Sequence, residues 1–517
     1  MGRLTGAPAS WAHPVATGAG HNLAATIEAT ARAQGWGART AFLVEATAVS
    51  HDEVHDGAAR AAAVLAGLGV GCGDVVLIVL PDGIEFVWSF LGAVRLGALA
   101  VPVNPELTTD DHLCLAKDSG AGVVVCSDEL RSRFDGGPQV VTAPELLRSL
   151  ALVSPHPAVP VDAGAPAYAQ YTSGTTGAPK AAVHRHGDPL VYTRAFAHGA
   201  ITLAPDDVVH SVSKMYFAYG LGNSLFFPLL CGARAVLLAL RPRPAETAAL
   251  VERHQVSVLF AVPTFYANLV RECAPAADGA FGSVRVAVSA GERLTTDLAT
   301  QASRLLGCPV LDGLGSTEVG QTFASNTADT VRPGTVGRAL PPYELAVCGR
   351  DATAVAPGEV GALWVRGPTV LLEYLGRPDA ATTDDEGWLR TEDLASVGTD
   401  GFVQLHGRAD DMEMVGGISV APAEIEELLG GHDAVSEVAV VAVTDADGAS
   451  RLRAFVVPAA PGSGDDSLAE ELTALARARL APFKVPRSVA FVDGLPRTPT
   501  GKLRRFVLRS GAAGSVE

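Results

Sequence analysis

The sequence has few cysteines, and they are not arranged in a way that could hold a fold together. Seven cysteines lie far apart among 517 residues, and no two of them form a CxxC pair. A disulfide-stabilised secreted domain or a zinc site requires paired, closely spaced cysteines. We therefore predict solitary thiols, a reducing compartment and a cytoplasmic protein.

Long apolar runs and an excess of positive charge are also missing. The longest apolar stretches, Val75–Leu80 and Phe86–Val94, are far shorter than the ~20 residues that span a bilayer, and residues 1–18 lack the apolar block of a secretory signal. Lys and Arg total 39 against 56 Asp and Glu, a formal charge of −17, whereas nucleic-acid binding requires a basic face. We expect no membrane partner and no nucleic-acid partner. A small anion held by local donors is compatible with this composition.

The sequence does contain the composition and alternation of a globular α/β protein. Hydrophobic residues make up 48% and charged residues 18% of the chain, which is typical of a protein with a folded core. β-branched runs alternate with Ala- and Leu-rich amphipathic stretches, and this order predicts βαβ units with parallel sheets covered on both faces. The predicted strands are Val75–Leu80, Val123–Cys126, Ala235–Leu238, Val256–Val262 and Val284–Ser289. The predicted helices are Gly57–Leu68, Ile84–Leu96 and Glu246–His254.

The pattern changes after about residue 355. Short antiparallel strands are predicted at Gly361–Gly367 and Gly401–Leu405. A segment of different character follows, with predicted elements at Pro422–Leu429 (helix), Val438–Val443 (strand) and Leu468–Leu480 (helix). We predict a large N-terminal domain, residues 1–408, of parallel and mixed sheets with a distorted antiparallel, barrel-like part. A small α+β C-terminal domain, residues 409–517, completes the prediction.

The stretch that says most about chemistry is Tyr171–Lys180, YTSGTTGAPK. Gly174 and Gly177 permit a tight turn and a close approach of the backbone to a ligand. The neighbouring hydroxyls and main-chain N–H groups suit phosphate oxygens, and Lys180 adds one positive charge. The spacing differs from the Walker A pattern GxxxxGK[ST], which disfavours an ordinary kinase or ATPase. The alternative interpretation of such a Gly- and Thr-rich string is an ordinary polar turn.

This string resembles the phosphate-binding signature of the adenylate-forming superfamily, which includes acyl-CoA synthetases, nonribosomal adenylation domains and luciferases. Four further motifs occur in that family's order: LGSTEVG at Leu314–Gly320, GWLRTEDLA at Gly387–Ala395, GRADD at Gly407–Asp411 and PRTPTGK at Pro496–Lys502. The resemblance covers nearly the whole chain and is strongest to benzoate-CoA ligases and related aryl-acid:carrier-protein ligases. It implies activation of a carboxylic acid with ATP and Mg²⁺.

The resemblance also implies roles for single residues. Lys502, Glu318 and Thr317 are implied to be catalytic, Glu318 to be the residue associated with the metal, and Asp410 to be the hinge of a mobile C-terminal domain. The residues implied to bind ATP or AMP are Thr172, Ser173, Gly174, Thr175, Thr176, Gly177, Lys180, Ser289, Ala290, Gly291, Glu292, Asp312, Gly313, Leu314, Gly315, Ser316, Thr317, Asp393, Arg408 and Lys502. Taken singly, each of these would more commonly be a turn, cap, core or surface residue. Their joint occurrence favours the functional interpretation.

The chemistry explains why these residue types occur together. A carboxylate is a poor electrophile, but its anhydride with the α-phosphate of ATP has AMP as a leaving group. Forming that anhydride brings two anions together, so positive charge must stabilise the transition state. Lys502 would bridge the carboxylate and the α-phosphate, Mg²⁺ near Glu318 would neutralise phosphate oxygens, and the Thr/Ser loop would hold pyrophosphate. Asp393 and Arg408 are implied to bind the ribose, and Asp312 to accept from the adenine amino group.

The acid is predicted from Ser213–Asn223, SKMYFAYGLGN, which is similar to the segment that gates the acyl pocket in benzoate-CoA ligases. Small residues leave room for a flat ring, and Tyr219 limits the depth of the slot. Leu314 replaces the aromatic residue that many family members stack on adenine, as it does in benzoate-activating relatives. No carboxylate in Met215–Gly222 could pair with an α-ammonium group. The implied aryl-acid pocket consists of Phe217, Ala218, Tyr219, Gly220, Gly313 and Leu314, although an aromatic cluster is more commonly core.

The thiol acceptor is left open by the sequence. Gly416 and Gly417 are implied to form the passage for a pantetheine arm, which CoA and the phosphopantetheine of an acyl carrier protein share. Met414 occupies a position near which many relatives carry Lys, and Glu413 precedes it, so a basic dock for the CoA nucleotide is disfavoured. A biosynthetic loading enzyme, for example in polyketide biosynthesis, fits the Ala-, Gly- and Arg-rich composition.

Taken together, the sequence predicts an AMP-forming acid–thiol ligase that converts benzoate or a close analogue into an aryl thioester. One alternative is another adenylate-forming enzyme, either a luciferase-type oxidoreductase or a ligase for a non-aryl acid. A second is a regulatory nucleotide-binding protein, which would typically have lost Lys502 or Glu318. No heptad pattern distinguishes a monomer from a homodimer.

Overall fold

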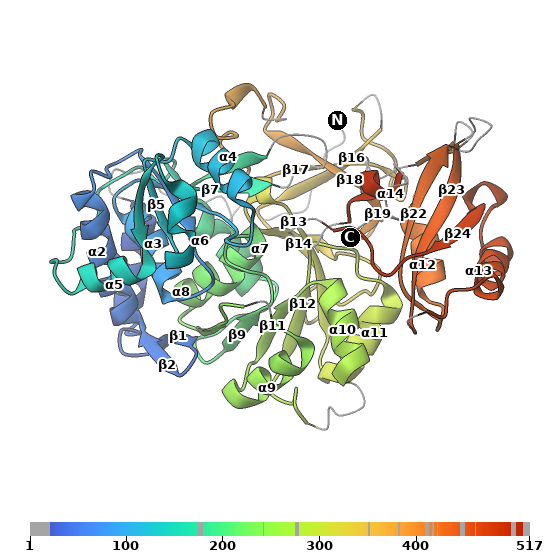
Figure 1. Cartoon of the computed structure of the whole chain (residues 1–517), viewed down its shortest axis with the longest axis horizontal. Coiled ribbons are helices and arrows are strands. Elements are labelled where there is room, and N and C mark those ends of the chain that lie inside the picture. Colours follow the sequence, from blue (N-terminus) through green and yellow to red (C-terminus); the bar gives the residue numbers. More distant parts are fainter. Residues whose placement is uncertain are drawn as a thin grey trace. The chain divides into compact units, whose positions relative to one another are not determined.

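The computed structural model describes residues 21–172, 179–240, 242–273, 279–349, 352–380, 383–408, 413–415, 418–420, 422–444, 450–460, 462–497 and 503–509. The chain divides into two compact units (Figure 1). The larger unit comprises Met1–Leu345 and Val365–Leu389, and the smaller unit comprises Ala346–Trp364 and Arg390–Glu517. The predicted hinge residue, Asp410, lies outside the described residues, and the division after residue 408 stays a prediction.

A nine-stranded sheet forms one half of the larger unit, in the order β15-β14-β13-β12-β11-β9-β10-β1-β2. Its strands are β1 (Thr40–Val44), β2 (Thr47–Ser50), β9 (Val208–Ser211), β10 (Arg234–Leu237), β11 (Val258–Ala261), β12 (Val286–Ser289), β13 (Val310–Gly315), β14 (Thr322–Ser325) and β15 (Arg338–Ala339). In this sheet the neighbouring strands β13, β12, β11, β9, β10 and β1 are parallel to one another. The strands β2, β14 and β15 are antiparallel to their neighbours. The carboxyl ends of the parallel strands therefore lie along one edge, where ligands bind in such sheets.

A second sheet has six strands in the order β6-β5-β3-β4-β7-β8. They are β3 (Val75–Val79), β4 (Leu99–Pro102), β5 (Val123–Cys126), β6 (Gln139–Thr142), β7 (Pro166–Thr172) and β8 (Lys180–Arg185). Only the β7–β8 pair is antiparallel within this order. β4 and β5 are buried along their whole length, because helices or the rest of the chain cover both faces of a parallel sheet.

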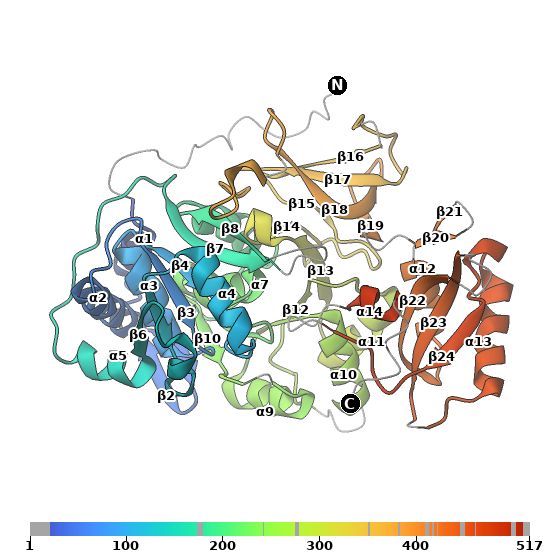
Figure 2. The same cartoon turned by 45° about the horizontal axis from the view of Figure 1, so that its top comes forward.

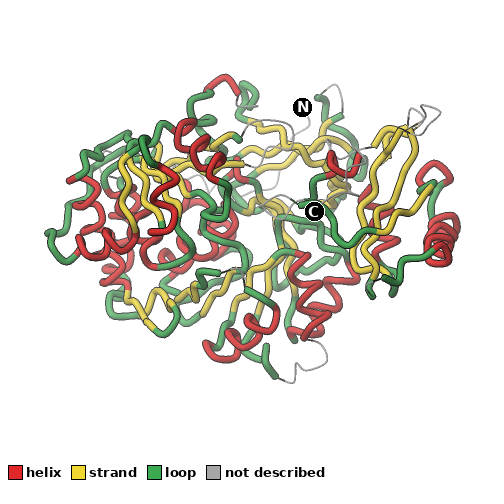
Figure 3. The backbone as a smooth tube through the Cα atoms, in the orientation of Figure 1, coloured by secondary structure: helices red, strands yellow, loops and turns green. Residues whose placement is uncertain are grey.

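Helices cover these sheets, as the alternation of segments in Figure 3 shows. The helices of the larger unit are α1 (Leu23–Ala33), α2 (His51–Gly67), α3 (Ile84–Arg95), α4 (Thr109–Ser119), α5 (Ala143–Leu150), α6 (Asp188–Tyr192), α7 (Ala218–Leu221), α8 (Phe227–Cys231), α9 (Pro244–His254), α10 (Pro263–Cys273) and α11 (Thr296–Leu306). α9, α10 and α11 pack their apolar faces against β11, β12 and β13 (Figure 1). None of the described helices has the length and apolar character that a membrane crossing requires.

The smaller unit contains most of a four-stranded sheet of order β16-β17-β18-β19, a two-stranded hairpin and a three-stranded sheet of order β22-β23-β24. The strands are β16 (Glu344–Cys348), β17 (Gly361–Arg366), β18 (Trp388–Val397), β19 (Val403–Arg408), β20 (Glu413–Val415), β21 (Ile418–Val420), β22 (Val435–Thr444), β23 (Ser450–Pro458) and β24 (Ser488–Phe491). The helices are α12 (Pro422–Gly430), α13 (Asp466–Arg479) and α14 (Arg505–Arg509). α12 and α13 pack on the three-stranded sheet through their buried leucines, and Figure 2 shows α13 beside β24. The predicted α/β fold class is confirmed.

Candidate active site

The carboxyl ends of β12 and β13 carry two buried polar residues side by side. Ser289 is the last residue of β12, and its partner in the parallel register is Asp312 on β13. Ser289 is 0% and Asp312 is 7% exposed. The sequence placed both residues at the nucleotide, and the fold brings them together because parallel register fixes adjacent strand ends at one edge.

Three side-chain atoms at this edge are buried without a hydrogen-bond partner in the part of the chain that the structure describes. They are Ser289 Oγ, Asp312 Oδ1 and Ser316 Oγ. Burial raises the pKa of Asp312 well above its ordinary value, although the Gly313 N–H and Arg293 oppose the shift. Buried polar atoms are normally satisfied, so unsatisfied atoms gathered at one edge need an explanation. A ligand that carries hydrogen-bonding groups would supply the missing partners.

The loop after β12 has a defined shape. Gly291 adopts a left-handed backbone conformation with φ of 88°, which favours glycine over other residues. The carboxylate of Glu292 accepts hydrogen bonds from the N–H and the hydroxyl of Thr264, at 3.0 and 2.7 Å. Glu292 therefore holds the loop against the start of α10, and Ala290 between Ser289 and Gly291 is buried at 3% exposure.

Glu318 lies in a short 3-10 helix, Thr317–Val319, directly after β13. Its Oε1 accepts a hydrogen bond from the Tyr374 hydroxyl at 3.0 Å. Lys180 Nζ lies 5.3 Å from the centre of the same Tyr374 ring, within the range of a cation–π contact. Burial and the Glu318 carboxylate raise the pKa of Tyr374, so its hydroxyl keeps its proton and donates. Two residues predicted to hold phosphate and metal are thus joined by a tyrosine that the sequence analysis missed.

The ends of the predicted phosphate loop are anchored by a small polar network. Thr172, at the end of β7, pairs with Lys180, at the start of β8. The Tyr171 hydroxyl donates to Asp118 at 2.9 Å. Arg377 forms an ion pair with the same carboxylate and donates to the Pro179 carbonyl at 2.7 Å. The chain therefore enters and leaves the loop at fixed points.

A buried histidine supports the segment that carries Thr317 and Glu318. His184 Nε2 lies 2.7 Å from the Thr317 carbonyl, and its Nδ1 lies 3.3 Å from Asp188 Oδ2. The His184 side chain is fully buried, and its ring stacks on Tyr168 with the ring centres 5.1 Å apart. The Thr317 carbonyl accepts a hydrogen bond from Nε2–H, so His184 positions the backbone of this segment and does not contact the Glu318 carboxylate through that bond.

The predicted aryl-acid pocket lies around α7, close to the nucleotide edge. The Tyr219 hydroxyl donates to the carbonyl of Val288, the residue before Ser289, at 3.3 Å. Its ring meets Phe260 edge-on with the ring centres 6.2 Å apart. Burial raises the pKa of Tyr219, and the charge of Asp312 raises it further. The fold therefore brings Tyr219 beside the residues predicted for adenine, while Phe217 directly precedes the helix and packs on Tyr216.

The glycines of this region serve backbone packing. A Cβ atom on Gly220 would lie 2.0 Å from the Lys214 carbonyl oxygen, and one on Gly313 would lie 3.1 Å from Thr322 Cγ2 and 3.3 Å from the Ala324 carbonyl oxygen. The position that a Cβ atom would take at each glycine is therefore occupied or tightly bordered by the protein. The room for a ring that the sequence analysis attributed partly to these glycines stays a prediction. Leu314, next to Gly313, is 8% exposed.

Gln321 is a second residue that the sequence analysis missed. Its Nε2 donates to the carbonyls of Ala218 and Tyr219, at 3.4 and 3.3 Å, and its Oε1 accepts from the N–H of Thr322 at 2.9 Å. The side chain is 3% exposed. It thereby ties α7 to β14. Nothing in the local sequence pattern distinguishes Gln321 or Tyr374 from any buried polar residue.

In the smaller unit, the residues predicted for ribose lie opposite each other. Asp393 on β18 pairs with Arg408 on β19 in an antiparallel register. The Arg408 guanidinium forms an ion pair with Glu392, and the Asp393 N–H donates to Thr391 Oγ1 at 3.1 Å. Glu413, which the sequence analysis took as an argument against a basic dock for the CoA nucleotide, is 4% exposed and accepts two hydrogen bonds from Arg509. Arg509 therefore compensates its charge.

Several predicted site residues lie outside the described residues. They are Ser173, Gly174, Thr175, Thr176, Gly177, Asp410, Gly416, Gly417 and Lys502. Their roles stay predictions.

The residues around Glu318 fit a magnesium ion that arrives with a phosphate substrate. Among the described residues, no group of three or more His, Cys, Asp or Glu could hold a metal ion. Glu318 offers one carboxylate, of which one oxygen is bound by Tyr374. Mg²⁺ is commonly held by one or two carboxylates together with substrate phosphates and water. The donor set therefore suits a metal that the substrate helps to bind.

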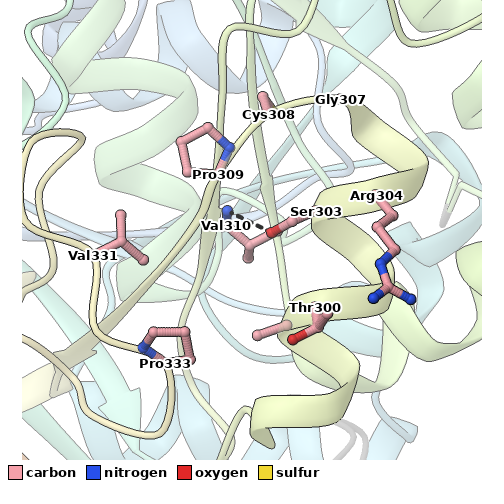
Figure 4. Close-up of a pocket in the computed structure, with 10 residues that line it drawn as sticks. Thr300, Ser303, Arg304, Gly307, Cys308, Pro309, Val310, Val331 and Pro333 are labelled. Carbon is pink, nitrogen blue, oxygen red and sulfur yellow. Dashed lines mark hydrogen bonds between the residues drawn. The ribbon is translucent and has the colours of Figure 1, made fainter.

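A hollow of about 470 Å³ lies at the opposite end of β13 (Figure 4). It is lined by α11, by Cys308, Pro309 and Val310 at the start of β13, and by Val331 and Pro333. Ser303 on α11 accepts a hydrogen bond from the Val310 N–H at 3.2 Å. None of the residues predicted for ATP or the acid lines this hollow. Since ligands bind at the carboxyl ends of parallel strands, the candidate site is the edge that carries Ser289 and Asp312.

Known proteins resemble the chain over nearly its full length. A p-hydroxybenzoic acid–AMP ligase of Mycobacterium tuberculosis is 46% identical over 489 residues, which cover 94% of this chain and 68% of the relative. A benzoate–CoA ligase of Thauera aromatica is 37% identical over 92% of this chain and 93% of its own length. The crystal structure of a benzoate CoA ligase from Burkholderia xenovorans LB400 superposes with a TM-score of 0.87, at 34% identity over 94% of this chain and 99% of that one.

An anthranilate CoA ligase in complex with anthranoyl-AMP gives a TM-score of 0.89 at 28% identity, covering 97% of this chain and 98% of that one. Residues 29–375 match the family described as AMP-binding enzyme, and residues 424–502 match the AMP-binding enzyme C-terminal domain. The resemblance on which the sequence analysis relied is confirmed. The chain belongs to the AMP-binding enzyme family, whose similar members are AMP-forming ligases.

Proposed function

We propose that the chain activates an aryl carboxylic acid, benzoate or a close analogue, with ATP and then passes the aroyl group to a pantetheine thiol. The observation that carries this proposal is a group of buried polar atoms, on Ser289, Asp312 and Ser316, that have no hydrogen-bond partner within the described ranges and lie beside Tyr219. A buried polar atom without a hydrogen bond destabilises the folded protein, and a ligand that supplies the missing partner removes this cost. A nucleotide next to a flat aromatic acid supplies both hydrogen-bonding groups and an apolar face.

The choice of an aryl acid is supported by the similar proteins. Their named substrates are p-hydroxybenzoic acid, benzoate and anthranilate, all of which are aryl carboxylic acids. The phenol and phenyl rings of Tyr219 and Phe217 supply the apolar surface that such a ring requires. Selection among ring substituents depends on a volume difference of the size of a methyl group, which is worth about 1–3 kcal/mol.

The first step joins the acid to the α-phosphate. A carboxylate oxygen forms a bond to the α-phosphorus of ATP, the bond to the bridging oxygen of the β-phosphate breaks, and pyrophosphate leaves. Lys502 is assigned the role of stabilising the negative charge of the transition state between the carboxylate and the α-phosphate. The Ser173–Gly177 loop and Lys180 are assigned the role of binding the departing pyrophosphate. Mg²⁺ would be held by Glu318 and the phosphates and would offset their negative charge.

Single residues are assigned to parts of the nucleotide. Asp312 is assigned to the adenine amino group, because its buried Oδ1 has no hydrogen-bond partner among the described residues and an amino donor would compensate it. Asp393 and Arg408 are assigned to the ribose hydroxyls, which suits their position on neighbouring strands. Tyr374 keeps the Glu318 carboxylate in place, and His184 keeps the Thr317 backbone in place.

The second step transfers the aroyl group. The thiol sulfur forms a bond to the carbonyl carbon of the aryl adenylate, its proton is lost, and AMP leaves with the bonding electrons. Gly416 and Gly417 are assigned to the passage for the pantetheine arm. Because Glu413 is compensated by Arg509, it does not repel an anionic CoA nucleotide. CoA and a carrier-protein phosphopantetheine are both acceptors under this proposal.

Two measurements test the proposal. ATP–pyrophosphate exchange should depend on benzoate or a close aryl acid, and an equal response to aryl, alkyl and amino acids would remove the substrate assignment. Incubation with ATP, aryl acid and either CoA or a holo-carrier protein, followed by mass spectrometry, should show an aroyl thioester with at least one acceptor. AMP release without any thioester would remove the second step.

A further inference from the structure

Two charged side chains are buried next to the segment that forms the proposed aryl-acid pocket. Asp82 lies between β3 and α3 in the six-stranded sheet, and Lys214 follows β9 in the nine-stranded sheet. Asp82 is 3% and Lys214 is 5% exposed. Lys214 Nζ lies 3.9 Å from Asp82 Oδ2. Burial of a charge is costly without a partner, so each of these side chains depends on the contacts that the other one and the backbone supply.

Both side chains hold backbone atoms that follow strand ends. Lys214 Nζ donates to the carbonyls of Leu238 and Leu240, each at 2.6 Å, just beyond the end of β10. Asp82 Oδ1 accepts from the Met215 N–H at 2.9 Å. The pair therefore joins three segments, namely the β3–α3 turn, the chain after β9 and the chain after β10. These contacts fix where the chain leaves β9.

The backbone of Lys214 in turn supports α7. Its carbonyl accepts a hydrogen bond from the Phe217 N–H at 2.9 Å. A Cβ atom on Gly220 would lie 2.0 Å from the same carbonyl oxygen, so α7 packs directly on this peptide group. A shift of Lys214 would therefore move Phe217 and Gly220, two residues that the proposed pocket contains.

We infer that the Asp82–Lys214 pair positions the aryl-acid pocket, with Lys214 fixing the backbone beneath α7 and Asp82 neutralising its ammonium group. The inference rests on the proposed function. Both residues act through Phe217–Gly220, so they are positioning residues. Their loss should weaken binding of the acid and reduce discrimination among ring substituents, and it should leave the nucleotide edge at Ser289 and Asp312 unchanged.

The first test is Asp82→Asn, measured by ATP–pyrophosphate exchange. The amide oxygen can still accept from the Met215 N–H, and the side chain keeps its size, so only the neutralising charge is lost. The KM for benzoate should rise about 10- to 100-fold, as for a small displacement of a binding element, and the KM for ATP should change less than twofold. The ratio of rates with benzoate and a ring-substituted benzoate should move towards one.

Asp207→Asn is the matched control. Asp207 is also a buried carboxylate, pairs with Arg285 at 2.7 Å and directly precedes β9, so it lies at the opposite end of the strand that leads to Lys214. Asp207→Asn should lower the melting temperature and leave the KM for benzoate within twofold of the wild-type value. An equal rise in the benzoate KM in both variants would overturn the inference, since it would indicate a general loss of packing.

The double variant Asp82→Asn/Lys214→Met separates positioning from folding. Removing both buried charges leaves no unpaired charge, so the melting temperature should recover relative to Asp82→Asn. The contacts to Leu238 and Leu240 are lost, so the benzoate KM should stay high. Recovery of both quantities would contradict the positioning role of Lys214.

The pH dependence of the benzoate KM provides a further readout. Burial raises the pKa of Asp82 to about 6, although Lys214 and the Met215 N–H oppose the shift. The charge of Lys214 acts on the pKa of Asp82 and also lowers the pKa of the nearby His210. The wild-type KM for benzoate should rise as the pH falls below about 6, and the Asp82→Asn profile should be flatter.

The outcomes distinguish this inference from the function on which it rests. If the wild-type protein shows no exchange with any aryl acid, both are wrong. If the wild-type protein shows aryl-dependent exchange but Asp82→Asn keeps the wild-type benzoate KM, or raises the KM for ATP equally, only the positioning inference is overturned.

Discussion

The two units hold their predicted site residues in different ways. In the larger unit, Ser289 and Asp312 lie at the ends of buried parallel strands, and each has an atom without a hydrogen-bond partner among the residues that the structure describes. In the smaller unit, Asp393 and Arg408 lie on paired strands, and Arg408 has Glu392 as an ionic partner. The difference is that the larger unit holds buried polar groups that a ligand could satisfy, whereas the arginine predicted for ribose in the smaller unit is already paired with a carboxylate.

Lys502→Ala should give the largest effect and tests the division of work between the units. Loss of the charge assigned to the transition state should reduce ATP–pyrophosphate exchange by about 10²–10³-fold. Attack of a thiol on supplied benzoyl-AMP should continue, because Lys502 is assigned to the first step alone. Exchange and thioester formation from the adenylate are measured separately.

Lys484→Ala is the control for this variant, since Lys484 also lies in the smaller unit and pairs with Glu424. Its exchange rate should stay within twofold of wild type. Equal loss of both half-reactions in Lys502→Ala would refute the assignment.

Asp312→Asn tests whether Asp312 serves to bind ATP at a cost to the stability of the folded protein. The amide oxygen can still accept from adenine, but it is a weaker acceptor than a carboxylate, so the KM for ATP should rise by up to about tenfold. The raised pKa of Asp312 means that the wild-type protein loses stability as the pH rises through that pKa. The variant should therefore lose less stability as the pH rises above the ordinary pKa of an aspartate, as measured by thermal unfolding.

Asp207→Asn should have the opposite effect on stability. Burial alone would raise the pKa of Asp207, but hydrogen bonds from Arg285 and Ser257 outweigh it and hold that pKa below its ordinary value. The ionised carboxylate therefore stabilises the protein above that pKa, and its removal should lower the melting temperature at pH 7. If Asp312→Asn lowered it as much and left the KM for ATP unchanged, Asp312 would be a structural residue.

Asp393→Asn tests the nucleotide contact of the smaller unit. Loss of a charged acceptor for a ribose hydroxyl should raise the KM for ATP by about tenfold, with little change in the KM for the acid. Asp466→Asn, at the exposed start of α13, is the control and should change neither constant. A change confined to the KM for the acid would contradict the ribose assignment.

The smallest effect concerns acid stability, and it should be confined to the larger unit. Burial lowers the pKa of His51, His55, His186 and His210 to about 4. Since their ordinary pKa is about 6.5, protonation favours the unfolded chain, and stability present above that pH is lost as the pH falls towards 4. The melting temperature should fall between pH 7 and pH 5, and hydrogen exchange should show the larger unit opening first. A constant melting temperature over this range would contradict the prediction.

Much of the fold could be predicted because buried strands have a strong local signal. The predicted strand Val123–Cys126 has the bounds of β5, and the predicted helix Ile84–Leu96 differs from α3 by one residue. The predicted helix Gly57–Leu68 begins too late. α2 starts at His51, because Ser50 and Glu53 form a capping box ahead of a polar first turn that carries no apolar periodicity.

The candidate site was predictable where a motif names its own residues. Ser289, Asp312 and Glu318 belong to local strings, whereas Tyr374 reaches Glu318 across 56 positions of the chain and Asp82 reaches Lys214 and Met215 from another sheet. Contacts of this kind arise from tertiary packing, and no periodicity or spacing in the sequence predicts them. The same holds for Gly220, whose neighbour Lys214 is known only once α7 has folded back on it.

Release of pyrophosphate from ATP, measured with purified protein, Mg²⁺ and a panel of aromatic, aliphatic and amino acids, tests the central claim most directly. The account predicts rapid release with benzoate or a ring-substituted benzoate and little release with the others. An absence of release with every aromatic acid, from protein that is folded and binds ATP, would contradict it.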